Sequence, residues 1–197
     1  LASEAMHGLG IPTTRALAVI GSDFPVYRET TETAAVLTRT APSLSRFGTF
    51  EYLSAHRLLA ERETLADQLI TDHFPSLLVL PKAERYAAWF AEVVERTARL
   101  MAMWMASGFA HGVMNTDNFS VLGLTLDYGP YGWMERYQPT WICNHSDHSG
   151  LYAFDRQPSV GLWNCTRFAE SLSGMVSRDD AVELLNQYAD AYQDEMP

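Results

Sequence analysis

The stretch GFAHGVMNTDNFSVLGLTLDYGPYG, residues 108–132, places an apolar run between two polar loops. Asp117 and Asn118 end the first loop, and Asp127 opens the second, directly after the run at 119–126. We expect the run to fold into a short hairpin, which returns its ends to one edge and brings the three polar side chains together. Carboxylate and amide oxygens are the ligands that a hard divalent ion such as Mg2+ accepts. The stretch therefore predicts that Asn118 and Asp127 hold a metal ion.

The same order of motifs occurs in protein kinases, where the catalytic loop H-R-D-x-x-x-x-N is followed by D-F-G. Here the loop keeps that length from His111 to Asn118, and D-Y-G starts at Asp127. The acidic residue has moved, because Val113 occupies the place of the kinase aspartate and Asp117 stands beside the asparagine. We therefore expect Asp117 to be the general base that accepts the proton of an incoming hydroxyl. The alternative is that these Asp and Asn residues only form turns, as they often do.

Composition limits the class of protein. With 197 residues and 47% hydrophobic content, the chain can bury a core as one domain, alone or as part of a larger one. Acidic residues outnumber basic ones by 24 to 14, and there is no basic stretch, which disfavours nucleic acid as a partner. The most apolar stretch, Leu100 to Ala110, is shorter than the roughly 20 residues that cross a bilayer, so a soluble protein is expected. Two cysteines, Cys143 and Cys165, are too few for a disulfide scaffold and fit a reducing compartment.

The N-terminal part has the pattern of a helix followed by a hairpin. Residues 1–9 look like the end of a helix that Gly10 and the following proline stop. Residues 15–20 and 34–40 are compatible with strands, and the Gly, Ser, Asp and Pro of residues 21–25 supply the turn between them.

The rest of the chain is predicted to be mainly helical. Residues 49–73 have a helical pattern with a break near Arg62, and residues 131–158 are expected to form an ordered loop. Two helices close the chain, the last capped by Ser177 and Asp180. The clearest helix has one broad apolar face, which we interpret as core: Tyr86, Trp89, Phe90, Val93, Val94, Leu100, Met101, Trp104 and Met105. The last helix is expected to bury Ala181, Leu184, Leu185, Tyr188 and Tyr192.

Several segments carry a more specific resemblance: SEAMHGLGIPTTRAL (3–17), PVYRET (25–30), LTRTAPSLSRFGTFE (37–51), GFAHGVMNTDN (108–118), LGLTLDYGPYG (122–132), NHSDHSG (144–150), and FDRQP and LWN within 154–164. Together they resemble the SelO (YdiU) family of protein adenylyltransferases. The resemblance implies a protein-kinase-like fold of the α+β class that is predominantly α-helical. Residues 1–48 would be part of the N-lobe, and residues 49–197 would be the helical C-lobe with the catalytic and metal loops.

The resemblance also implies an activity: transfer of AMP from ATP, bound in a reversed orientation, to Ser, Thr or Tyr hydroxyls of proteins, with release of pyrophosphate. By position, Asp117 matches the catalytic base, and Asn118 and Asp127 match the ligands of Mg2+, or of Mn2+ in its place. Arg39 and Arg46 match the arginines that contact the nucleotide phosphates. A guanidinium suits this role because it binds phosphate oxygens in pairs and stays charged. Surface solvation is the alternative for both arginines.

One part of the family's ATP site is missing from this sequence. The phosphate-binding lysine and its partner glutamate have no counterpart, because Lys82 is the only lysine and follows Pro81 at a helix start. We therefore expect the chain to be an internal fragment that is inactive by itself. Two rival functions stay open, namely a kinase-like phosphotransferase and a nucleotide-binding pseudokinase without catalysis. The expected location is the cytoplasm for a bacterial protein and the mitochondrion for a eukaryotic one.

A second polar loop contains residue types that bind zinc: Cys143, His145, Asp147 and His148. Their spacing lacks the paired C-x-x-C of structural zinc sites. We instead expect a loop near the active site in which the histidines form hydrogen bonds. Cys143 is a candidate redox-sensitive thiol if the complete protein supplies a partner.

Overall fold

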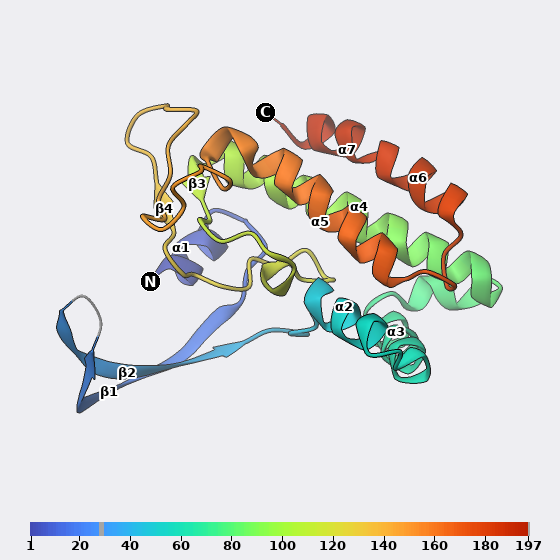
Figure 1. The fold of residues 1–197 in the computed structure, drawn as a ribbon, viewed down its shortest axis with the longest axis horizontal. Helices are drawn as coiled ribbons and strands as arrows, with labels where there is room; N and C mark the ends of the chain where they lie inside the picture. The colour runs from blue at the N-terminus through green and yellow to red at the C-terminus, as the bar shows by residue number, and fades with distance from the viewer. Residues whose placement is uncertain (28–29, 197) are drawn as a thin grey trace.

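The computed structural model describes residues 1–27 and 30–196, so Arg28 and Glu29 of the PVYRET segment and Pro197 lie outside the described residues. The fold is a mostly helical α+β arrangement with two small antiparallel sheets, β1-β2 and β3-β4 (Figure 1). The strands are β1 (Arg15–Tyr27), β2 (Thr31–Thr40), β3 (Phe109–Ala110) and β4 (Gly132–Trp133). The α-helices are α1 (Ala2–Gly8), α2 (Phe47–Ala55), α3 (Leu59–His73), α4 (Lys82–Ala106), α5 (Gln157–Ser171), α6 (Arg178–Asn186) and α7 (Tyr188–Glu195). Three 3₁₀ helices lie between them: η1 (Pro75–Val79), η2 (Thr116–Asn118) and η3 (Phe154–Arg156).

The N-terminal helix and hairpin are present, but the predicted turn is wrong. Strand β1 continues through Gly21 to Tyr27, and Pro25 pairs with Thr33 on β2. The register shifts between Gly21 and Pro25, so the turn-forming residues make an irregularity inside the strand. A two-stranded ribbon tolerates this because both of its strands are edges, where a proline loses no obligatory partner. In Figure 1 the ribbon extends away from the helices.

The predicted break in the segment 49–73 is present, but it lies before Arg62 rather than at it. Helix α2 ends at Ala55 and α3 begins at Leu59, and between them Arg57 has a positive φ of 57°. Arg62 lies inside α3 and is only 4% exposed. Its guanidinium donates to the backbone oxygens of Ser171 and Ser173, which makes burial of the charge tolerable.

The long apolar helix is confirmed as α4, and its aromatic face is core. All nine predicted residues except Met105 are buried. Phe168 of α5 joins this face to α2, with its ring centroid 4.5 Å from Phe47 and 5.6 Å from Trp89. The interpretation of the face as packing surface is therefore confirmed.

The C-terminal region contains three helices rather than two, because α7 follows α6 after Gln187. The cap is confirmed, since the Asp180 backbone N–H donates to Ser177 Oγ at 3.1 Å. Of the five residues predicted to be buried, only Tyr188 is fully so, and the other four are partly buried against the core. Figure 1 shows the reason: α6 and α7 form an outer layer along α4 and α5.

Candidate active site

The apolar run of residues 119–126 returns its ends to one edge, although it is not a regular hairpin. It keeps one antiparallel bridge, between Phe119 and Thr125. This bridge joins the residue after Asn118 to a residue two positions before Asp127. The end of the first polar loop and the start of the second therefore lie close together.

The rest of the run is held by other segments, which explains why the hairpin is incomplete. Ser120 forms a bridge with Arg46, directly before α2. The Thr125 backbone N–H donates to Pro12 O at 2.9 Å, and its side-chain Oγ1 donates to the same oxygen at 3.0 Å. The run thus ties the N-terminal segment and α2 to the first polar loop.

Asn118 closes that first loop and is 9% exposed. It ends the 3₁₀ helix η2, where its backbone N–H donates to Asn115 O at 3.0 Å. Its side-chain Nδ2 donates to Val113 O at 2.8 Å. The amide nitrogen is thereby occupied, and Oδ1 is the side-chain atom left to accept a ligand.

Asp127 is held by Arg39, which reaches it from β2. Arg39 Nη2 contacts Asp127 Oδ1 at 3.2 Å, and Nη1 donates to Leu126 O at 2.6 Å. The Tyr128 backbone N–H donates to the same Oδ1 at 2.8 Å. Burial raises the pKa of Asp127, but the hydrogen bonds from Arg39 and Tyr128 outweigh it and hold the pKa below its ordinary value. The carboxylate is therefore ionised at neutral pH, and its Oδ2 makes no hydrogen bond within the described part of the chain.

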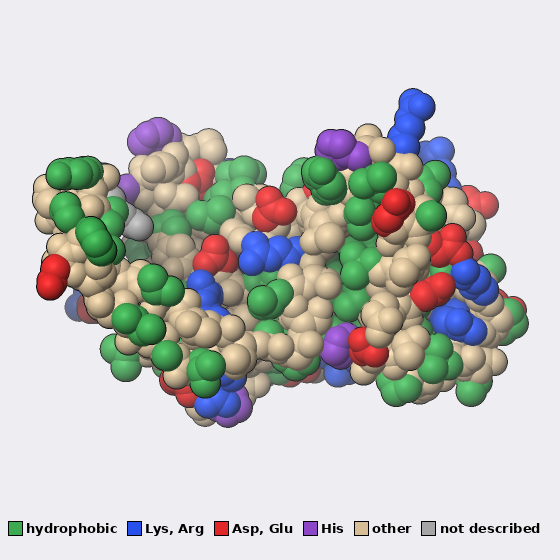
Figure 2. Space-filling view, turned by 90° about the horizontal axis from the view of Figure 1, so that it is seen from below, with side chains coloured by type: hydrophobic (Ala, Val, Ile, Leu, Met, Phe, Trp, Pro, Cys, Tyr) green, Lys and Arg blue, Asp and Glu red, His purple; other side chains and the backbone are tan. Residues whose placement is uncertain are grey.

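Asp117 is exposed and lies against the first turn of α2. Arg46, the residue before this helix, donates from Nη1 to the backbone oxygen of Asp117 at 2.9 Å. Each predicted arginine thus contacts one of the two acidic loops: Arg39 holds Asp127, and Arg46 holds Asp117. On the face seen in Figure 2, acidic and basic side chains lie next to each other in the middle of the molecule, between the hairpin and the helices.

His111, which begins the first loop, has a structural role that the sequence reasoning missed. It is 1% exposed and stacks on Trp104 with ring centroids 5.1 Å apart. Burial lowers the pKa of His111 to about 4, although the nearby Asp127 charge opposes the shift. The ring is therefore neutral at physiological pH. The only signal in the sequence was its place at the head of the loop.

The loop around Cys143 does not form a zinc site. The described residues contain no group of three or more His, Cys, Asp or Glu side chains that could hold a metal. Asp147 instead accepts the Leu151 and Tyr152 backbone N–H groups at 2.9 and 2.7 Å. These contacts use the Asp147 carboxylate to shape its own loop. His145 and His148 are exposed and form no hydrogen bond in the described part of the chain, so the prediction that these histidines form hydrogen bonds is wrong.

This loop lies beside the first polar loop, which agrees with the expected position near the candidate active site. Asn144 Nδ2 donates to Gly112 O at 3.0 Å, and Cys143 Sγ donates to Pro130 O at 2.6 Å. Cys143 and Asn144 together therefore connect the loop that ends at Asn118 with the loop that starts at Asp127. Burial raises the pKa of the Cys143 thiol to about 11, which disfavours the reactive thiolate.

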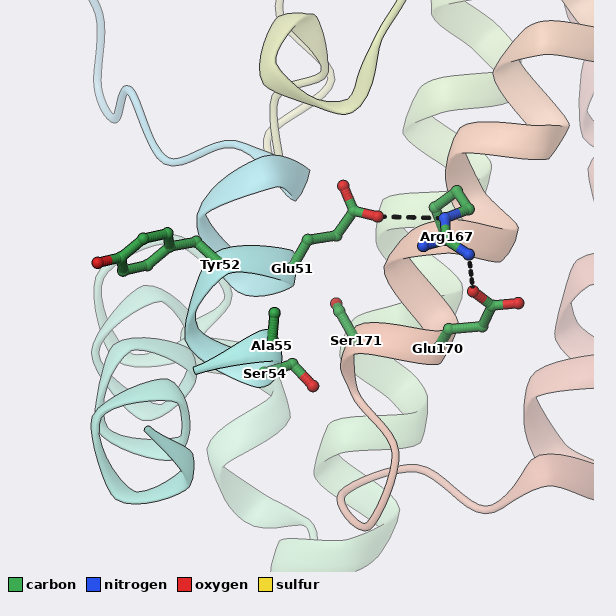
Figure 3. A pocket seen from close by; sticks show the side chains of 7 residues that line it. All are labelled: Glu51, Tyr52, Ser54, Ala55, Arg167, Glu170 and Ser171. Atoms are coloured by element: carbon green, nitrogen blue, oxygen red, sulfur yellow. Dashed lines mark hydrogen bonds and ion pairs between the residues drawn. The ribbon is translucent and has the colours of Figure 1, made fainter. Parts of the chain in front are cut away.

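Five surface cavities outlined by the described residues are lined by side chains other than Asp117, Asn118 and Asp127. One of them, of about 480 Å³, lies between α2 and α5, and Glu51 and Arg167 are among its lining residues (Figure 3). Within residues 1–27 and 30–196, no helix is both long and apolar enough to span a bilayer.

Comparison with known proteins identifies the family. The family described as "Protein adenylyltransferase SelO" matches residues 1–196. A "Protein nucleotidyltransferase YdiU" of Myxococcus xanthus is 57% identical over 192 residues, which are 98% of this chain and 39% of the relative. Proteins of the same name from Thioalkalivibrio sulfidiphilus and Cronobacter sakazakii are 55% and 56% identical, and the alignments cover 98% and 97% of this chain.

The chain spans 39% of the length of each of these three curated relatives. Because the family match runs over almost every residue, the resemblance of the separate motifs is confirmed. The chain therefore belongs to the SelO family of protein adenylyltransferases.

Proposed function

We propose that the complete protein transfers AMP from ATP to Ser, Thr or Tyr hydroxyls of other proteins and releases pyrophosphate. Membership of the family supports the reaction class. The observation that carries the site assignment is the Phe119–Thr125 bridge, which brings together the loops of Asn118 and Asp127. The relatives compared above are bacterial, which favours the cytoplasmic alternative.

The residues of the two loops fit a hard divalent ion. Asn118 Oδ1 and Asp127 Oδ2 are oxygen atoms that can coordinate a metal ion, and neither accepts a hydrogen bond from the described residues. Asp127 is ionised, and two oxygen ligands with phosphates and water complete the shell that Mg2+ prefers. When bound, Mg2+ or Mn2+ would offset negative charge on the phosphates.

Asp117 is assigned the role of general base. Its carboxylate takes the proton of the attacking hydroxyl, whose oxygen forms a bond to the α-phosphorus of ATP. The bond between the α-phosphorus and the bridging oxygen breaks, and pyrophosphate leaves with that oxygen. Exposure of Asp117 supports this role, because a protein substrate has to reach it from outside.

Arg39 and Arg46 are assigned to the phosphates, and each has a second task. Each already contacts an acidic loop, through Asp127 Oδ1 and Asp117 O respectively. A guanidinium has five N–H donors, so it can hold a loop and still donate to a phosphate oxygen. Both arginines would then couple nucleotide binding to the position of the loops.

The lobe assignment follows from the family. We propose that residues 1–48 are part of the N-lobe of a protein-kinase-like fold and that residues 49–197 are its C-lobe. The helical layer of α4 and α5 around the Trp89 and Phe168 cluster supports the C-lobe assignment.

Labelled ATP tests the proposal. The complete protein is incubated with Mg2+, a mixture of bacterial proteins, and ATP labelled at either the α or the γ phosphate. Label retained on protein from the α position alone is the expected result. Label from the γ position would show a kinase-like phosphotransferase, and nucleotide binding without any labelled product would show a pseudokinase. D127A should abolish metal-dependent ATP binding and labelling together, whereas full labelling by this variant would overturn the assignment.

A further inference from the structure

Glu51 lies where α2, α5 and the first polar loop meet. Its Oε2 accepts a hydrogen bond from Thr116 Oγ1, and its Oε1 accepts one from Arg167 Nε at 3.1 Å. Figure 3 shows the Glu51 carboxylate pointing from α2 across the gap to Arg167 on α5. Thr116 directly precedes Asp117 in the chain, so this carboxylate grips the loop next to the proposed base.

Gly48, which lies three residues before Glu51 on α2, makes a second contact with the same loop. A Cβ placed on Gly48 would stand 2.0 Å from Asp117 Oδ1 and 3.3 Å from Asp117 N. Side-chain carbons do not approach an oxygen that closely, so the Asp117 carboxylate occupies space that only glycine leaves open. Residues three apart lie on the same face of a helix, and this face of α2 therefore meets both Thr116 and Asp117.

Arg167 completes the arrangement from the opposite side. It pairs with Glu51 and also with Glu170, which lies one turn along α5. The Arg167 and Glu51 side chains are 42% and 27% exposed, and ion pairs this open to water contribute at most about 1 kcal/mol to stability. The contribution of these ion pairs to folding stability is therefore too small to account by itself for the contacts through which the Glu51 carboxylate connects α5, α2 and the loop.

We propose that Glu51 is a positioning residue: held by Arg167, it fixes Thr116 and so keeps the Asp117 carboxylate in the space that Gly48 leaves open. The inference rests on the proposed role of Asp117 as the base. Glu51 itself makes no hydrogen bond to the proposed metal ligands Asn118 and Asp127, or to the arginines assigned to the phosphates, in the described contacts.

Two isosteric changes in the complete protein test this role. E51Q removes one of the two acceptor oxygens, and T116V removes only the hydroxyl that donates to Glu51. Each should lower kcat by about 10- to 100-fold, because small displacements of a reacting group have effects of that size. The KM for ATP should stay within about twofold, since the nucleotide contacts are untouched. T116S keeps the hydroxyl and should restore most of the activity, and the E51Q/T116V double variant should be no worse than either single one.

The matched control is E170Q. Glu170 binds the same arginine, but it makes no contact with the first polar loop among the described residues. E170Q should therefore leave kcat close to that of the unaltered protein. It controls for any general effect of weakening the ion pairs of Arg167.

A measurement without turnover separates this inference from the proposed activity. Hydrogen exchange of residues 115–119 reports on η2, where the Asn118 and Phe119 backbone N–H groups donate to Asn115 and Thr116. Exchange should be faster in E51Q and T116V and unchanged in E170Q. Faster exchange in a protein that transfers no AMP would overturn the proposed function, and Glu51 would then hold the loop in place without positioning a base.

Two results would overturn the inference. One is unchanged exchange together with kcat within about twofold of the unaltered protein in both variants. The other is a loss of ATP affinity as large as the loss of kcat, which would make Glu51 a binding or structural residue. If E51Q folds poorly, T116V carries the test alone, because it deletes a single hydrogen bond.

Discussion

Among single residues, Asp127 should make stability depend on pH. Its pKa is lowered below the ordinary value of 3.8 in the folded state, mainly by Arg39 and the Tyr128 N–H against the opposing effect of burial. The unfolded chain therefore binds the proton more readily, and the stabilisation is fully present above 3.8 and is lost as pH falls through the folded pKa. The carboxylate is 44% exposed, so we expect less than about 1 kcal/mol.

Urea unfolding of the complete protein and of D127N measures this contribution. The two midpoints should differ at neutral pH and converge in acid. R39M should remove most of the same pH-dependent difference, because it deletes the pairing guanidinium. A difference between the midpoints that stays constant down to the lowest pH would contradict the explanation.

Gly48 allows a prediction in which stability and activity change in opposite directions. Alanine is favoured over glycine inside a helix by about 1 kcal/mol, and Gly48 does not have a positive φ. G48A should therefore not lower the melting temperature by much. Its Cβ must push away the Asp117 carboxylate, so AMP transfer should fall by at least about 10-fold.

The control for G48A is G8A on α1, where an added Cβ would meet nothing within 4 Å. It should change neither activity nor fold. Retained activity in G48A would show that AMP transfer does not depend on the position of the Asp117 carboxylate against Gly48.

Motifs in the sequence indicated the residues of the proposed site, but not the side chains that we propose to support them. Asp117, Asn118 and Asp127 could be chosen because their spacing and the run between them are local features of the chain. Glu51 and Arg167 could not, because their contacts join positions 65 and 116 residues apart. Such pairings depend on how α2 and α5 pack around Phe168, which periodicity does not specify.

Among the helices and strands, α3 offers a test of a buried charge. Arg62 links α3 to the end of α5 and the residues after it, through donations to the oxygens of Ser171 and Ser173. Burial lowers the pKa of Arg62, so the charge is held at a cost that these hydrogen bonds offset. R62M should fill similar volume but leave both oxygens without this donor, which costs about 1–3 kcal/mol.

Thermal and urea unfolding of R62M measure that cost, and R178M on α6 serves as the control. Arg178 is exposed at the start of α6, so its replacement should change stability by less than about 0.5 kcal/mol. An R62M protein as stable as R178M would show that Arg62 is not an anchor between these elements.

Long elements could be predicted better than their ends. The apolar period from Tyr86 onward is regular enough to identify α4, because packing of one face determines it. The break predicted near Arg62 lies earlier in the structure, between Ala55 and Leu59, and the turn predicted after Ile20 is wrong. Gly, Ser, Asp and Pro within residues 21–25 usually mark a turn, but here this stretch lies inside β1 and pairs with β2. Arg62 stays inside α3 because backbone oxygens of the α5 end accept its hydrogen bonds.

At the scale of the whole molecule, the β1-β2 hairpin exposes several large apolar side chains. Phe24, Leu17 and Val19 are 78%, 69% and 69% exposed on β1, and Val36 on β2 is 62% exposed. Both strands also have a free edge in the described part of the chain. Contiguous apolar surface and unpaired edges favour association with another chain or segment.

We therefore expect the 197-residue chain, produced alone, to self-associate through this ribbon. Light scattering after size exclusion should show oligomers whose proportion rises with concentration. V19K combined with F24K should suppress them, since charges on an edge strand oppose pairing, whereas V182K on α6 should not. Val182 is a fair control because it is 53% exposed yet lies on the helical outer layer. Oligomers that persist in the V19K/F24K chain would place the association elsewhere and leave the exposed ribbon without this consequence.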